Sequence, residues 1–157
     1  MAWKEIARFT VQGDPKPGGS KSYKGMSKAG KAIIVDACKG NKSWRESVKW
    51  AGFEAYQGEL IRNTAIQLEI TFLKTRPQSH FGSGRNADKL KASAPSKPLT
   101  RPDATKLTRS TEDALTGVIW YDDSLITDQH IYRRYADRPG AEIVVSVEAV
   151  DALGEDE

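Results

Sequence analysis

Three segments of the chain alternate hydrophobic and polar residues, which is the pattern of a β-strand with one buried face. The alternation is clearest at 65–72, AIQLEITF, where four large apolar side chains are separated by Gln, Glu and Thr. It recurs at 141–149 and, more weakly, at 6–11. Apolar residues at 119–121 and 124–135 are expected to supply one or two more strands.

Two other segments have the 3.6-residue spacing of an amphipathic helix. The first starts at Ser43, which has capping-box spacing to Glu46, and ends at Gly58. The second runs from about 104 to 116, where Pro and Asp precede the first turn and Gly follows the last. Because helices and strands do not alternate strictly, the sequence predicts a single domain of the α/β or α+β class, with a mixed β-sheet and two main helices.

Two long stretches without a regular pattern separate these elements, and both are basic. Residues 13–42 contain seven Lys against two Asp, and residues 74–101 contain seven Lys and Arg against one Asp. Their length and charge favour contacts with a polyanion, and the alternative is a flexible basic linker. The domain is expected to span 1–150 and to be followed by an acidic tail at 151–157.

The net charge of the 157 residues is only +3, but the charges are polarised along the chain. Residues 1–107 hold 20 Lys and Arg against 9 Asp and Glu, whereas residues 108–157 hold 4 against 12. This distribution is typical of a protein that binds a polyanion with one part and metal cations with the other.

The single cysteine and the two histidines, fifty residues apart, leave no Cys- or His-based metal motif. A metal site therefore needs carboxylates, which suit Mg²⁺ or Mn²⁺. No run of 18 apolar residues and no apolar N-terminal stretch is present, so the sequence predicts a cytoplasmic protein without membrane contacts.

Segment 25–31 matches GxxxxGK, the start of the phosphate-binding loop of nucleoside triphosphatases. Ala32 stands where that loop needs Ser or Thr, no apolar strand precedes the segment, and the residues after it are expected to be extended rather than helical. This context argues against a nucleotide-binding loop, although the lysines remain suitable ligands for nucleic-acid phosphates.

Acidic residues gather around the second helix and the segment that follows it. They are Asp103, Glu112, Asp113, Asp122, Asp123 and Asp128. Carboxylates converging from several elements are what a magnesium-dependent phosphodiesterase needs, because the ion takes oxygen ligands and neutralises charge on the scissile phosphate. The structural alternatives are a helix cap at Asp103, an ion pair between Arg109 and Asp113, and an ordinary turn at 122–123.

The same region carries three motifs in order: PDATKL at 102–107, DALTG at 113–117 and, after a short apolar stretch, two aspartates at 122–123. In this order and spacing they resemble the RusA-like Holliday junction resolvases, which are common in bacteriophages and prophages. The resemblance is looser at 9–21, which looks like the family's N-terminal strand and basic loop, and at 133–147, which looks like its closing hairpin.

The resemblance implies a homodimer that binds a four-way DNA junction and makes paired symmetric nicks with Mg²⁺ or Mn²⁺, in a bacterial or phage-infected cell. Asp103 and Asp123 look like the family's metal ligands. Arg109 stands where members carry a catalytic lysine, and its fixed charge suits electrostatic stabilisation rather than proton transfer. Asp122 and Asp128 also match acidic positions of the pattern.

Thr105 departs from the pattern, in which a second Asp is usually a metal ligand. Its hydroxyl offers a neutral oxygen, so the site is expected to bind metal more weakly. Glu112 shares its helix face but lies about 10 Å further along the axis, and is not expected to replace the missing carboxylate. The preferred site is one ion held by Asp103 and Asp123, with Asp122 or Thr105 as a further ligand.

The leading hypothesis is therefore a metal-dependent, structure-selective DNA endonuclease. Its expected phosphate contacts are Lys16, Lys21, Lys24, Lys28, Lys31, Arg101, Lys106, Arg133 and Arg134. The first alternative is a catalytically impaired protein that binds branched DNA, because Thr105 and Arg109 both depart from the family pattern. The second is a basic RNA-binding or structural module whose acidic residues only balance charge.

Overall fold

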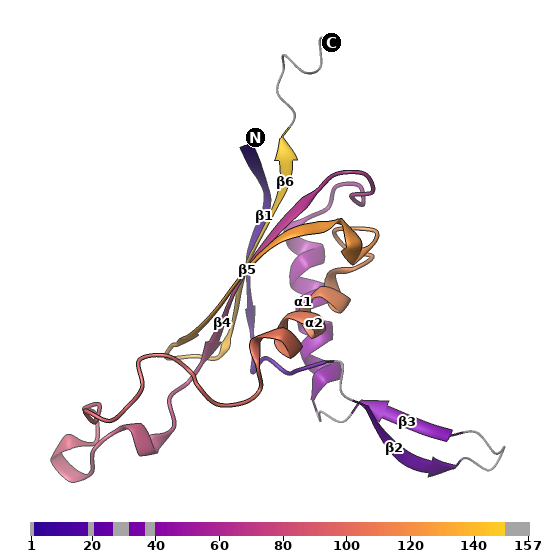
Figure 1. The fold of residues 1–157 in the computed structure, drawn as a ribbon. Coiled ribbons are helices and arrows are strands. Elements are labelled where there is room, and N and C mark those ends of the chain that lie inside the picture. The colour runs from indigo at the N-terminus through magenta and orange to yellow at the C-terminus, as the bar shows by residue number, and fades with distance from the viewer. Residues whose placement is uncertain (1, 19–20, 27–31, 37–39, 150–157) are drawn as a thin grey trace.

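The computed structural model of the chain describes residues 2–18, 21–26, 32–36 and 40–149 (Figure 1). The strands are β1 (Ala2–Gln12), β2 (Lys21–Met26), β3 (Ala32–Asp36), β4 (Ile66–Lys74), β5 (Ile126–Tyr135) and β6 (Gly140–Ala149). The helices are α1 (Asn41–Ala55) and α2 (Ala104–Leu115), and three short 3₁₀ turns are η1 (Gln78–His80), η2 (Gly84–Asn86) and η3 (Asp123–Leu125). The predicted α+β class is confirmed, and the expected acidic tail lies outside the described residues.

The main sheet has the strand order β1-β6-β4-β5, and β2 pairs with β3 in a separate two-stranded sheet. In the main sheet β6 is antiparallel to both β1 and β4, whereas β4 and β5 are parallel. The expected closing hairpin is therefore wrong, because β4 lies between β5 and β6. The residues that join those two strands pass the end of β4, where the Ala136 N–H donates to the Lys74 carbonyl over 2.9 Å.

Both helices cover one face of the main sheet (Figure 1). The alternation predicted for β4 places Ile66, Leu68, Ile70 and Phe72 in the core, and the residues between them are only partly buried. α2 belongs to the crossover that connects parallel strands β4 and β5, so the sheet fixes the position of this helix.

The two helices pack closely at Gly52 of α1. A Cβ atom added there would lie 2.5 Å from Cδ2 of Leu115 in α2, and 3.7 Å from the Ile119 and Phe9 side chains. Nearby, the indole N–H of Trp44 donates to the Thr111 hydroxyl over 3.4 Å in the buried interface. Glycine at position 52 therefore lets α1 approach α2.

Other local expectations need correction. Residues 119–121 form a turn rather than a strand, although Trp120 is wholly buried and bridges to Ile61. α1 begins after Gly40, which has a φ of 93° and no side-chain cap, so Ser43 lies inside the helix and is not its N-cap. The stretch 13–42 is not all irregular, because it contains the β2–β3 pair. The extended conformation predicted after residue 31 is confirmed by β3.

Residues 75–99, which follow β4, leave the sheet as a projecting arm with two 3₁₀ turns (Figure 1). We call this segment the arm. None of the described helices is long and apolar enough to cross a membrane.

Candidate functional site

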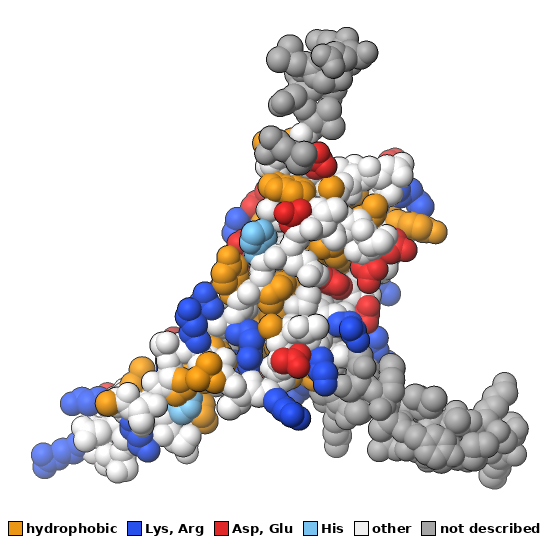
Figure 2. Space-filling model, viewed as in Figure 1, with side chains coloured by type: hydrophobic (Ala, Val, Ile, Leu, Met, Phe, Trp, Pro, Cys, Tyr) orange, Lys and Arg blue, Asp and Glu red, His pale blue; other side chains and the backbone are white. Residues whose placement is uncertain are grey.

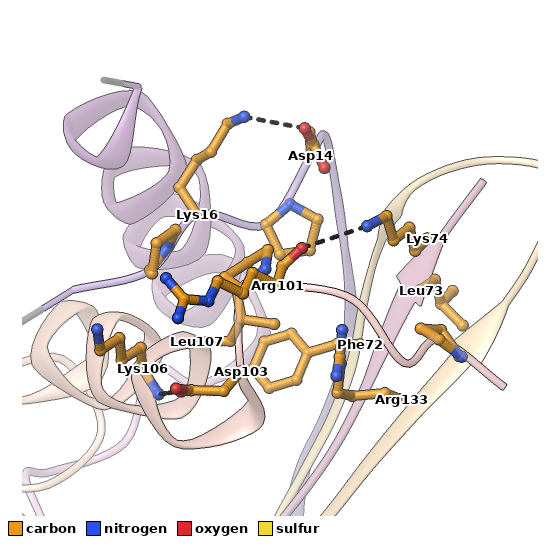
Figure 3. Close-up of a pocket in the computed structure, with 14 residues that line it drawn as sticks. Asp14, Lys16, Phe72, Leu73, Lys74, Arg101, Asp103, Lys106, Leu107 and Arg133 are labelled. Atoms are coloured by element: carbon orange, nitrogen blue, oxygen red, sulfur yellow. Dashed lines mark hydrogen bonds and ion pairs between the residues drawn. The ribbon is translucent and has the colours of Figure 1, made fainter. Parts of the chain in front are cut away.

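A pocket of about 520 Å³ opens at the N-terminal end of α2 (Figure 3). It is lined by residues 14–17 after β1, the end of β4, Pro98 and residues 101–103 before α2, the first turns of that helix, and one residue of β5. Its cations are Lys16, Lys74, Arg101, Lys106 and Arg133, and its carboxylates are Asp14 and Asp103. Five cations against two carboxylates make this pocket a favourable site for a phosphate group.

Asp103 is the N-cap of α2, as one of the structural alternatives anticipated. Its Oδ1 accepts a hydrogen bond from the Lys106 backbone N–H over 2.9 Å, and the carboxylate remains exposed. Because a side-chain oxygen that caps a helix is fixed by the first turn, the fold holds this carboxylate beside the cations of the pocket.

Two of the cations are oriented by Thr100, the residue that follows the arm. Lys74 Nζ donates to the Thr100 hydroxyl over 3.0 Å, and the Arg133 guanidinium donates to the Thr100 carbonyl. The sequence analysis predicted Arg133 as a phosphate contact but did not single out Lys74, which it included only in the basic stretch 74–101. The parallel pairing of β4 and β5 places the two residues near one another, and no local pattern could have indicated this.

Lys16 reaches the pocket because the loop after β1 lies against α2. The Gly18 N–H donates to the Lys106 carbonyl over 3.0 Å, and a Cβ added at Gly18 would lie 3.1 Å from the Ser110 Cα. Lys16 Nζ forms an ion pair with Asp14 at 2.9 Å, which partly neutralises the loop. The remaining excess of positive charge comes from the other four cations.

An acidic region extends along α2 from its first turn to its last and includes Asp123 of η3. Thr105, Arg109 and Glu112 follow one another at helical spacing on the less buried side of the helix, and the Gln129 amide of β5 donates to the Glu112 carboxylate. Burial is the main cause that raises the pKa of Glu112; Asp123 raises this pKa further, and the Gln129 hydrogen bond lowers it. Glu112 and Asp123 are therefore electrostatic neighbours, a pairing that sequence spacing did not indicate.

The other acidic candidates have local roles. Asp122 is the N-cap of η3, where its Oδ1 accepts from the Ser124 N–H over 2.9 Å, and this bond lowers its pKa. Asp128 accepts from the Thr127 hydroxyl over 2.8 Å. In the strand register Asp128 lies opposite Gln67 of β4, and the next residue, Gln129, faces α2. Because successive side chains of a strand point to opposite faces, Asp128 lies on the face of the sheet away from the helices. The turn anticipated at 122–123 is confirmed.

Within the described part of the chain, no three His, Cys, Asp or Glu side chains meet as a group that could hold a metal ion. The acidic candidates therefore do not converge as a ready-made cage. Mg²⁺ nevertheless needs only one or two protein carboxylates when waters and a substrate phosphate complete its shell. The exposed carboxylate of Asp103 beside a cationic pocket has the donor chemistry for such an open site.

Of the remaining basic candidates, the structure describes the side chain of Arg134, which does not line the pocket. Arg134 stacks on Tyr132, with its guanidinium carbon 5.1 Å from the ring centroid, and lines a second hollow beside the arm. Lys21 and Lys24 lie on β2, whose side chains are not described, and Lys28 and Lys31 lie outside the described residues.

Comparison with known proteins gives two results. A family model described as "Endodeoxyribonuclease RusA" matches residues 13–146, which is most of the chain and includes both the pocket and the acidic region. A protein of Bacillus subtilis (strain 168), described as uncharacterized protein YqaN, is 25% identical over 141 residues, covering 90% of this chain and 96% of its own length.

Proposed function

Because the chain belongs to the RusA endodeoxyribonuclease family, we propose that it is a metal-dependent endonuclease that resolves four-way DNA junctions by paired symmetric nicks. The observation that carries this proposal is the exposed Asp103 carboxylate, held by its capping bond at the edge of a pocket with five cations. A carboxylate beside clustered cations suits metal-dependent phosphodiester cleavage, because the carboxylate can hold the ion while the cations bind the phosphates and neutralise developing charge.

In this proposal the pocket cations bind backbone phosphates and orient the DNA strand over Asp103. Asp103 and Asp123 would hold Mg²⁺, or Mn²⁺ in its place, with the Thr105 hydroxyl as a weak neutral ligand, whereas Asp122 acts as the cap of η3. When bound, the ion supplies Lewis-acid stabilisation of charge on the scissile phosphate. Arg109 contributes fixed positive charge on the same helix.

Paired nicks on opposing strands need two active sites related by a two-fold axis, so the proposed active form is a homodimer. Its proposed place of action is the cytoplasm of a bacterial or phage-infected cell, where branched DNA arises.

The test is incubation of the purified chain with a labelled four-way junction, with linear duplex and single-stranded RNA as competitors, in Mg²⁺, Mn²⁺ or EDTA. We expect symmetric nicks in the junction that require a divalent ion and are not competed by RNA. Salt-sensitive junction binding without nicks in either metal would support the alternative of an impaired binder. Preference for RNA would overturn both.

The variant Thr105→Asp distinguishes the hypothesis of an active enzyme from that of a catalytically impaired DNA-binding protein. Restoring a carboxylate beside Asp103 adds one negative charge to the proposed site, so we expect cleavage to reach half its maximum at a Mg²⁺ concentration on the order of tenfold lower. The measurement is a Mg²⁺ titration of the initial nicking rate. Thr105→Asn is the matched control, because it has similar size and no charge.

An unchanged Mg²⁺ requirement in Thr105→Asp would remove Thr105 from the proposed site. An Asp in the first turn also stabilises the helix through its interaction with the helix dipole. The melting temperatures of both variants are therefore measured, to separate a change in stability from a change in metal affinity.

A further inference from the structure

The arm carries a concentration of positive charge away from the pocket. Between residues 75 and 99 the cations are Arg76, Arg85, Lys89, Lys91 and Lys97, and the acid is Asp88. Figure 2 shows blue side chains along this projection, on its tip and where it meets the body of the protein. Arg85, Lys89 and Lys91 are exposed.

The arm has a defined conformation although it contributes almost nothing to the core. No residue from 75 to 97 is buried, so hydrophobic packing does not explain its path. Backbone hydrogen bonds define this path instead. The Gly82 N–H donates to the Lys89 carbonyl over 3.0 Å, and the Lys91 N–H donates to the His80 carbonyl over 2.9 Å. Gly84 has a φ of 58°, a conformation that L side chains rarely adopt. These features present the tip cations in a fixed arrangement.

An aromatic and guanidinium cluster attaches the arm to the sheet. Arg76 Nη1 donates to the Pro95 carbonyl over 2.8 Å, and its guanidinium carbon lies 4.2 Å from the ring centroid of Tyr135 in β5. The His80 ring packs edge-on against Tyr135, with centroids 5.5 Å apart. The arm is therefore tied to the strand that also carries Arg133.

The root of the arm is part of the pocket wall. Pro98 of the arm lines the pocket, and Thr100, the residue after the arm, accepts hydrogen bonds from Lys74 and Arg133. DNA bound in the pocket would therefore lie beside the base of the arm. The tip cations are then placed to contact phosphates farther along the same duplex.

We propose that the arm is a second DNA-binding surface, which contacts the phosphate backbone of a duplex outside the catalytic pocket through Arg85, Lys89 and Lys91. This inference rests on the proposed function, because it takes DNA as the polyanion. A protein partner fits the arm less well, since interface cores are depleted in charged residues and the exposed large apolar side chains of this segment are only Leu90 and Leu99 among those described.

The test compares the triple variant Arg85→Ala/Lys89→Ala/Lys91→Ala with a control triple variant, Lys4→Ala/Lys49→Ala/Arg62→Ala. Each set removes two lysines and one arginine from exposed positions, and the control residues lie on β1, on α1 and in the segment before β4. Junction affinity is measured as a function of salt with Ca²⁺ in place of Mg²⁺, and hydroxyl-radical footprints are recorded on junctions with long duplex arms.

For the arm variant we expect the slope of log K against log salt to become shallower by about 0.9 for each DNA phosphate that the arm no longer neutralises. The affinity at low salt is expected to fall on the order of tenfold. The footprint should lose its outer protected nucleotides and keep those at the branch point. The control variant should change the slope by less than about 0.9, the value for a single phosphate.

An arm variant with the slope and footprint of the unmodified protein would overturn the inference while leaving the proposed function intact. Sedimentation without DNA adds a second criterion: weaker self-association of the arm variant with an unchanged salt slope would mean that the arm contacts the partner copy instead. Absence of junction binding by the unmodified protein would reject the proposed function itself.

Discussion

Asp103→Asn is expected to reduce junction cleavage by at least about a hundredfold while leaving junction binding unchanged or slightly tighter. The substitution removes a charge from the proposed metal site but keeps an oxygen that can accept the 2.9 Å bond from the Lys106 N–H. Asn and Asp are equally good N-cap residues, so α2 should keep its stability. Binding does not suffer because the variant removes a negative charge from a pocket that holds phosphates. Single-turnover nicking rates and junction titrations measure the two effects separately.

Two further substitutions at Asp103 distinguish its role in catalysis from its role as the helix cap. Asp103→Ser keeps a capping oxygen and should match the Asn variant in both lost activity and retained stability, whereas Asp103→Ala loses the cap and should also cost about 1 kcal/mol of stability. Asp137→Asn, an exposed Asp in the connection between β5 and β6, is the charge-matched control and should cut normally. Near-normal cleavage by both the Asn and the Ser variants would exclude the Asp103 carboxylate from catalysis.

Gly52→Val is expected to have the largest effect on stability. The added Cβ alone would lie 2.5 Å from Leu115 Cδ2, and Leu115 and Ile119 are wholly buried, so neither side chain can move away without disturbing the core. Overpacking of this kind costs about 3 kcal/mol, which corresponds to a fall in melting temperature of roughly 6–12 °C for a domain of this size. Thermal unfolding followed by circular dichroism provides the measurement.

Glu54→Val is the control for Gly52→Val, because it introduces the same β-branched side chain at an exposed position of the same helix. It should cost less than about 1 kcal/mol, the scale of helix propensity alone. Gly52→Ala should also be destabilising. A rise in its melting temperature, the usual result of replacing Gly by Ala inside a helix, would show that α1 and α2 are not in this close contact.

Much of the fold followed from local patterns. The alternation of β4 predicted both its strand and its buried face, and the Pro-Asp start and Gly stop predicted α2 within one residue. The N-cap predicted for α1, Ser43, was wrong. The helix begins after Gly40, which has a left-handed conformation and no side chain that could mark it as a cap in the sequence. β2 was missed because it is rich in polar residues and lacks the alternation that marks a half-buried strand.

By itself, the sequence determined the fold class, the family motifs, the cap at Asp103 and the separation of basic from acidic segments. These depend on side-chain chemistry and on spacings within a few residues, which one chain displays directly. Only the tertiary structure decided that β4 separates β5 from β6, that the charge of Asp123 raises the pKa of Glu112, and that cations from 16 to 133 line one pocket. The physical reason is that strand pairing and helix docking join residues distant in sequence, and such contacts depend on the packing of the whole domain rather than on any local pattern.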